Sequence, residues 1–199
     1  MGSYNLSCRC GQTQMFVEGP HIATVECLCE SCQTAAKTLE ALPGAEPVLD
    51  ENGATPFVMH RKDRLAITAG HENLKAYRLS GDAGTRRVVA TCCNTPMFME
   101  LKGGHWLSIY GTLWFEDERP ALEMRTMVGT RDDLPNDVVN MQTHTLGFYG
   151  RLFSAWAKMG FQNPKVEDNG ELNACASRQS SSRDSERAWS NRTSGSREV

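Results

Sequence analysis

Seven of the eight cysteines lie in three short clusters whose spacing is typical of metal ligands. The clusters are Cys8-Arg9-Cys10, Cys27-Leu28-Cys29-Glu30-Ser31-Cys32 and the adjacent pair Cys92-Cys93. Thiolates that are one to three residues apart can converge on one ion at about 2.3 Å from each sulfur. Such close neighbours are poorly placed to join distant segments by disulfides. The chemistry that the sequence indicates is metal binding by sulfur.

The middle cluster offers three sulfurs, those of Cys27, Cys29 and Cys32, within six residues. Three protein ligands leave a tetrahedral zinc ion with an open position, as in catalytic sites, whereas four ligands close a structural site. In the open arrangement, a small thiol can occupy the fourth position and become a nucleophile for an aldehyde. The closed arrangement needs a fourth ligand, and its candidates are His60, His71, Cys92 and Glu30.

The other two clusters are far apart in the sequence, so coordination of one ion by both would tie the first strand to a late hairpin. The ligands would be Cys8, Cys10, Cys92 and Cys93. The alternatives are buried free cysteines, a Cys92–Cys93 disulfide, or redox sensing by that pair. Cys175 stands alone, and we expect an incidental surface thiol there.

Composition favours one domain with a tail. The chain has 199 residues, 40% of them hydrophobic, which suffices for a single sizeable core. The first residues lack the features of a signal peptide, and no apolar run approaches the roughly 20 residues of a membrane span. We therefore expect a cytoplasmic protein without a membrane partner. A net charge of −3 argues against a nucleic-acid partner.

Short apolar runs separated by Gly, Pro, Asn and Asp predict a mainly β domain over residues 1–115. Residues 116–165 form a C-terminal extension whose helix should pack on that domain. Residues 166–199 are rich in Ser and Arg, which predicts a disordered tail. The strands are expected near 13–18, 22–26, 57–60, 64–68, 74–79, 86–91, 96–100 and 105–114.

Two helices are expected. The first covers 32–42, with Ser31 as its cap, and it places Cys32 in a first turn that favours the thiolate. An irregular loop follows over 43–56. The second helix covers 146–160, and we expect its periodic apolar residues to pack in the core. These residues are Leu146, Tyr149, Leu152, Phe153, Trp156 and Met159.

Basic residues near the clusters offer a second kind of site. Lys37, Arg86 and Arg87 can hold an anionic substrate or be solvated charges. Neither a phosphate-binding glycine loop nor a nucleophile elbow is present, so the sequence gives no support to a nucleotide-binding or hydrolase function.

In order, the motifs CxCG, CxCxxC and Cys-x-Thr-Pro resemble those of the glutathione-dependent formaldehyde-activating enzymes, a family that includes centromere protein V. Further resemblance lies in Gly19-Pro20, in Leu65 to Tyr77 and in Ile109-Tyr110-Gly111-Thr112-Leu113. The similarity covers roughly residues 5–115. Three motifs in one order are far more specific than a single CxxC.

This resemblance implies twisted antiparallel β-sheets that carry two zinc ions. It implies a structural site, which maps to Cys8, Cys10 and Cys93, and a zinc linked to activity at Cys27, Cys29 and Cys32. The implied reaction joins formaldehyde to glutathione as S-hydroxymethylglutathione, and its reversal is that of a carbon–sulfur lyase. The implied partners are a small thiol, such as glutathione, and a small aldehyde.

One departure indicates a divergent member of that family. Its last motif is CxxCG, and aligning its second cysteine with Cys93 places Ala90 at the first cysteine and Asn94 at the glycine. Asn tolerates the left-handed conformation that Gly would adopt. Cys92 is the candidate replacement for the missing sulfur. The alternative to an enzyme is a non-catalytic binding module stabilised by zinc.

Overall fold

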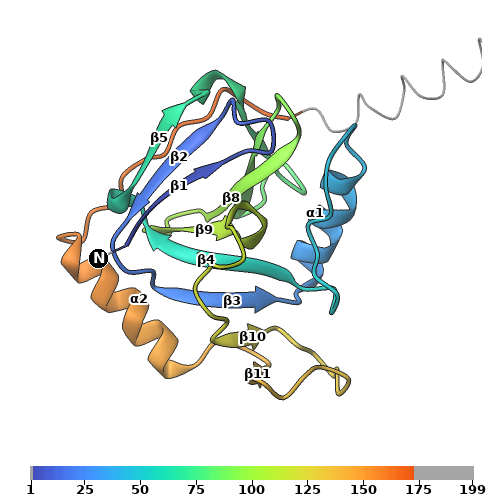
Figure 1. Cartoon of the computed structure of the whole chain (residues 1–199). Helices are drawn as coiled ribbons and strands as arrows, with labels where there is room; N and C mark the ends of the chain where they lie inside the picture. The colour runs from blue at the N-terminus through green and yellow to red at the C-terminus, as the bar shows by residue number, and fades with distance from the viewer. Residues whose placement is uncertain (1, 173–199) are drawn as a thin grey trace, which may run out of the picture.

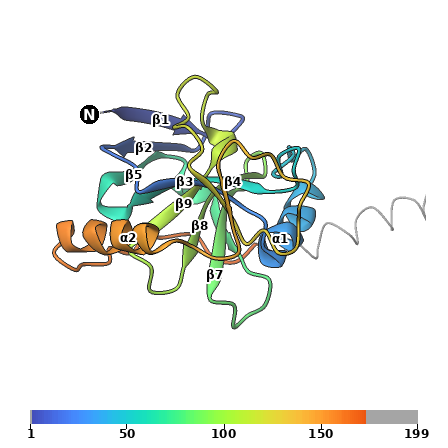
Figure 2. The ribbon, with the colours of Figure 1, turned by 90° about the horizontal axis from the view of Figure 1, so that it is seen from below.

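The structure is a computed structural model that describes residues 2–172. It contains two β-sheets, two α-helices and three short 3-10 helices (Figure 1). The smaller sheet is antiparallel and has the strand order β1-β2-β5. Its strands are β1 (Ser3–Ser7), β2 (Gln14–Glu18) and β5 (Leu65–Ala69). Seen from below, it forms a layer beside the larger sheet (Figure 2).

The larger sheet has eight strands in the order β11-β10-β3-β4-β9-β8-β7-β6. Its strands are β3 (Ala23–Cys27), β4 (Thr55–Arg61), β6 (Leu74–Tyr77), β7 (Thr85–Ala90), β8 (Thr95–Leu101), β9 (Trp106–Tyr110), β10 (Met124–Thr126) and β11 (Val139–Met141). All pairs from β3 to β6 are antiparallel, whereas β10 runs parallel to both β3 and β11. The predicted mainly β fold is confirmed, with a mixed edge in place of a purely antiparallel sheet.

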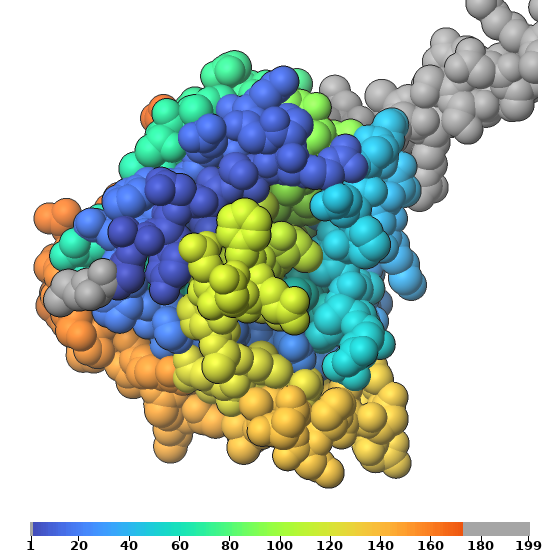
Figure 3. Space-filling view, in the orientation of Figure 1, coloured from blue at the N-terminus to red at the C-terminus, as the bar shows by residue number. Residues whose placement is uncertain are grey.

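The C-terminal extension therefore does more than pack a helix on the first domain. Its strand β10 pairs with β3 and lengthens the same sheet. Between β9 and β10 the chain passes through a 3-10 turn, Gly111–Leu113, and crosses the surface between the N-terminal strands and the loop before β4 (Figure 3). The expected strand at 105–114 ends at Tyr110 because this turn begins there.

Each of the eight expected strands overlaps an observed one, and three short strands were not expected. In β1 only Leu6 is fully buried, so its sequence gives little periodic signal. Strands β10 and β11 have three residues each, which is too short for periodicity to be read. The other 3-10 helices, Lys62–Arg64 and His71–Asn73, flank β5.

Both sheets contribute to one hydrophobic core. The three-stranded sheet buries Leu6, Met15 and Val17, and the large sheet buries Phe57, Phe98 and other side chains in the same cluster. Because each strand next to a cysteine cluster is anchored in this core, the turns that carry the cysteines begin from fixed positions.

Helix α1 (Glu30–Glu40) begins two residues earlier than expected. Its N-cap is Cys29 and not Ser31, since the Cys29 sulfur accepts a hydrogen bond from the Cys32 N–H at 3.4 Å. The helix ends before Pro43, as expected. Its buried residues follow helical spacing and face the large sheet: Cys32, Ala35, Ala36 and Leu39.

Helix α2 (Leu146–Lys158) confirms the expected C-terminal helix and the burial of Leu152 and Met159, but not the rest of the expected buried face. It buries Phe148, Leu152 and Ala155, followed by Met159. Four residues expected in the core are exposed: Leu146, Tyr149, Phe153 and Trp156. The helix is apolar on several sides, so periodicity could not select the side that packs. Neither helix of residues 2–172 is long and apolar enough to cross a membrane.

The segment after α2 returns to the large sheet along β6. The Ala76 N–H donates to the carbonyl of Gly170 at 2.8 Å, and the Asn169 N–H donates to that of Leu74 at 2.7 Å. The prediction that a disordered tail begins at 166 is therefore wrong for its first residues, because Asn169, Gly170 and Leu172 make backbone hydrogen bonds with β6 and Glu171 forms an isolated bridge with Ala76. The rest of the predicted tail, with Cys175, lies outside the described residues.

Candidate metal centres

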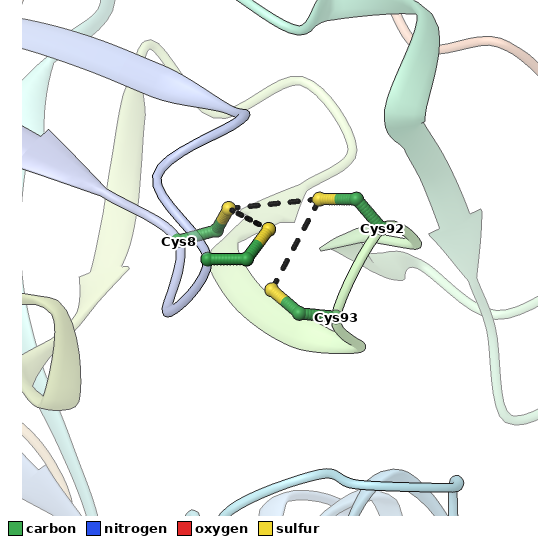
Figure 4. Close-up of side chains that lie close together, drawn as sticks. Cys8, Cys92 and Cys93 are labelled. Atoms are coloured by element: carbon green, nitrogen blue, oxygen red, sulfur yellow. Dashed lines mark hydrogen bonds between the residues drawn. The ribbon is translucent and has the colours of Figure 1, made fainter.

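Two hairpins bring four cysteines together. Cys8 and Cys10 lie in the turn between β1 and β2, and Cys92 and Cys93 lie in the turn between β7 and β8 (Figure 4). The sulfur of Cys8 is 3.6 Å from that of Cys10 and 3.6 Å from that of Cys92, and the sulfurs of Cys92 and Cys93 are 4.0 Å apart. All four lie within 4.8 Å of one another.

These distances fit coordination of one ion. A tetrahedral ion with sulfurs at about 2.3 Å has edges of about 3.8 Å between them. The four cysteines are free thiols, so the proposed disulfide between Cys92 and Cys93 is absent from the described structure. Since β1 and β2 belong to the small sheet and β7 and β8 to the large one, an ion held here joins the two sheets.

Polar neighbours support the charged form of sulfur in this four-cysteine site. The Thr13 N–H donates to the Cys8 sulfur at 3.3 Å. The Thr95 hydroxyl lies 3.1 Å from the Cys93 sulfur. Burial raises the pKa of Cys93, but hydrogen bonds from Thr95 and from the Cys10 backbone outweigh it and lower that pKa to about 6. A thiolate is thus favoured at Cys93 near neutral pH.

The turn at Cys92-Cys93 retains the geometry that a glycine would give. Asn94 has φ of 56°, the left-handed conformation expected for this position. Its side-chain amide donates to the Pro43 carbonyl at 3.0 Å. Ala90 is fully buried at the end of β7, and Cys92 provides the sulfur near Cys8. The structure thus brings together all four cysteines that the sequence singled out for this site.

The middle cluster forms a separate three-cysteine site. Cys27 ends β3, Cys29 caps α1 and Cys32 lies in the first turn of that helix. Their sulfurs lie within 4.8 Å of one another, and within residues 2–172 no histidine, carboxylate or further cysteine joins the group. Cys92 belongs to the other site, and His60 is stacked on Trp114 with ring centroids 6.1 Å apart. The geometry therefore favours three protein ligands.

The three sulfurs share their protons unequally. Hydrogen bonds from the sulfurs of Cys27 and Cys32 hold the pKa of Cys29 far below its usual range, and the Arg87 guanidinium lowers it further. The same contacts, together with burial, raise the pKa of Cys32. Cys29 is therefore the sulfur that carries negative charge first, at the N-terminus of a helix.

The basic residues lie in different surroundings from those expected. Arg87 is 1% exposed, and its Nη2 donates to the carbonyl and the hydroxyl of Ser31 at 3.0 and 2.9 Å. Arg86 pairs with Glu100 and Asp168, and Lys37 is exposed on α1. Arg87 lies 56 residues after Ser31 in the sequence, so spacing along the chain did not reveal this contact.

Two threonines beside Cys27 escaped the sequence analysis. Cys27 is paired across the sheet with Thr55 of β4 on one side and Thr126 of β10 on the other. Directly opposite residues place their side chains on the same face. Both hydroxyls are buried and have no hydrogen-bond partner among the described residues. No spacing rule links these residues to Cys27, because the sheet order alone makes them neighbours.

A family model described as a family of unknown function, DUF6151, matches residues 3–113, which is more than half of the chain. The chain belongs to the DUF6151 family. In this DUF6151 protein the matched range includes both cysteine sites, Thr55 and Arg87, and it ends before Thr126.

This DUF6151 protein was also compared with curated proteins and with solved structures. No curated protein matches it. Among solved structures it is similar to a protein of Rhodobacter sphaeroides from a structural genomics programme, with 14% sequence identity and a TM-score of 0.42. The match covers 69% of this chain and 99% of the other.

Proposed function

We propose that this protein is a zinc enzyme that forms or cleaves the adduct of a small thiol and a small aldehyde, with glutathione and formaldehyde as the substrates. The product of the forward reaction is S-hydroxymethylglutathione, and the reverse reaction is that of a carbon–sulfur lyase. The observation that carries this proposal is the group of three sulfurs at Cys27, Cys29 and Cys32, which within residues 2–172 has no fourth protein ligand. The order of the three cysteine motifs in the chain resembles that of the glutathione-dependent formaldehyde-activating enzymes.

The donor set suits zinc because zinc accepts thiolate sulfur and tetrahedral geometry. When bound, zinc lowers the pKa of a thiol in its remaining position and so makes that thiol a nucleophile at neutral pH. In the forward reaction the thiolate sulfur forms a bond to the carbonyl carbon. The carbonyl oxygen then takes up one proton, which balances the proton that the thiol released.

The residues of the chain hold this arrangement in place. Cys27 is anchored at the end of a central strand, and Cys29 and Cys32 are fixed by the first turn of α1. The Cys32 N–H stabilises negative charge on the Cys29 sulfur. The buried hydroxyls of Thr55 and Thr126 are donors on the same face of the sheet as Cys27. In this proposal the four-cysteine site holds a second zinc that serves the fold.

Exchange of formaldehyde with glutathione, followed by NMR with and without the zinc-loaded protein, tests the activity. We expect the protein to accelerate exchange and the Cys27→Ser variant to lose that acceleration. Arg64→Gln is a control, since Arg64 is exposed, pairs with Glu18 and follows the end of β4 opposite Thr55, the residue that pairs with Cys27. Absence of acceleration by a sample with two zinc ions per chain would refute the proposal.

A non-catalytic module stabilised by zinc is the second candidate function, and helix α2 is the observation that favours it. Its apolar residues Leu146, Tyr149 and Phe153 are exposed, as a partner-binding surface requires. This function predicts that a Cys27→Ala, Cys29→Ala double variant unfolds. It also predicts that glutathione leaves the absorption spectrum of the cobalt-substituted protein unchanged. If the protein is an enzyme, glutathione should change the spectrum of the cobalt ion at the three-cysteine site alone.

A further inference from the structure

Arg87 is a buried cation whose counter-charge is not a carboxylate. It is 1% exposed, and it forms no ion pair within residues 2–172. Two hydrogen bonds from Nη2 go to Ser31, and Nη1 has no partner among the described residues. Tyr110 lies beside it, and burial raises the pKa of Tyr110, so this neighbour is neutral. A buried guanidinium without an anion is strongly disfavoured.

The position of Arg87 narrows the choice of anion. Ser31, to which it donates, lies in the first turn of α1 between Cys29 and Cys32. The N-terminus of a helix carries partial positive charge, which repels a cation. A guanidinium is therefore stable here only if negative charge is present at the same helix end. Glu30 also lies in this turn, but it is exposed and forms no ion pair with Arg87 in the described part of the chain. The remaining groups at this end that can provide the negative charge are the sulfurs of the three-cysteine site.

Charge balance at the site supports the same conclusion. A divalent ion and three thiolates carry a net charge of −1, and one guanidinium brings the total to zero. Binding releases the protons that the thiols still carry, whereas a guanidinium keeps its charge in proteins. The four-cysteine site is different, since the nearby Arg9 is half-exposed and lies 4.0 Å from Glu46.

We propose that Arg87 is a positioning residue that supplies the counter-charge of the three-cysteine metal site, so that this buried site accepts a divalent, thiolate-binding ion. The inference rests on the proposed metal site at Cys27, Cys29 and Cys32 and adds a residue to it. It requires that the positive charge of Arg87, beyond its hydrogen bonds to Ser31, strengthens metal binding.

Cadmium titration followed by ¹¹³Cd NMR tests this role, because the two sites of one chain give separate resonances. In Arg87→Met, we expect the three-cysteine site to bind cadmium at least tenfold more weakly and the four-cysteine site to be unchanged. Arg87→Lys, which retains the charge, should stay within about threefold of the wild-type affinity.

Each outcome separates this inference from the proposed function. If the wild-type chain binds cadmium only at the four-cysteine site, both fail. If it binds two ions and Arg87→Met binds both as tightly, only the inference fails. The inference is also overturned if Arg87→Lys loses as much cadmium affinity as Arg87→Met. The shape and hydrogen bonds of the arginine side chain, and not its charge, would then support the site. Should Arg87→Met not fold, Arg87→Lys decides: affinity within threefold of wild type supports the inference and a tenfold loss overturns it.

Discussion

The two cysteine sites differ in how far apart in the sequence their cysteines lie. The four-cysteine site takes its ligands from two hairpins of different sheets, and its Cys10 is exposed. The three-cysteine site takes all its ligands from six consecutive residues at a strand end and a helix start, beside the buried Arg87. Ligands from distant segments convert metal binding into folding free energy. Ligands from one short segment depend less on the fold, and three of them would leave one position of a tetrahedral ion unfilled.

The largest effect should come from removing one sulfur of the four-cysteine site. Cys8→Ser should lower the melting temperature of the zinc-loaded protein by about 10 °C, since it loses the ion proposed to join the two sheets, and a ligand at about 1,000 times its Kd contributes about 4 kcal/mol. Cys27→Ser should lower it by less than half as much. Calorimetry measures both, and in excess chelator the Cys8→Ser and wild-type proteins should converge. An equal loss from Cys27→Ser would abolish the distinction between the sites.

Acid should release metal from both sites. His60 gives protein stability a separate pH dependence, which has to be measured without metal. Burial, together with the nearby His21, lowers the pKa of His60 to about 4. The unfolded chain therefore binds the proton first, and stability should fall as pH decreases from about 6.5 to about 4. The loss contributed by His60 should be about 3 kcal/mol.

Urea unfolding of the chelator-treated protein measures this contribution. His60→Phe keeps a ring against Trp114 and should remove the His60 component, so the difference between variant and wild type should grow as pH falls through this window. If that difference does not vary with pH, the neutral state of His60 is not the cause. In the zinc-loaded His60→Phe variant, the pH dependence of stability that remains should come from the release of metal by the two cysteine sites.

The smallest effect concerns the turn that carries Cys92 and Cys93. Asn94→Ala should destabilise the protein by about 1–2 kcal/mol, because Ala is strained at positive φ and the hydrogen bond to Pro43 is lost. The free energy of unfolding of Asn94→Gly should stay within about 0.5 kcal/mol of the wild-type value. Glycine adopts positive φ without strain, and this gain offsets the loss of the hydrogen bond to Pro43. Urea unfolding gives both values. Cobalt spectra of Asn94→Ala should change at the four-cysteine site alone.

Local patterns predicted local features well. The apolar runs located eight of the strands, and the residues before Pro43 marked the end of α1. The backbone of Asn94 followed from its alignment with a glycine. The sequence failed where two arrangements have the same pattern: the buried face of α2, and the cap of α1, where a cysteine sulfur replaced a serine hydroxyl.

The cysteine spacing by itself determined that Cys27, Cys29 and Cys32 would converge, because a chain of six residues can bring three sulfurs within reach of one ion whatever the surrounding fold. Only the tertiary structure decided that Cys8 and Cys10 meet Cys92 and Cys93, and that Arg87, Thr55 and Thr126 surround the other site. These groups are neighbours through the order of strands in the sheets. That order results from long-range packing, which local spacing does not encode.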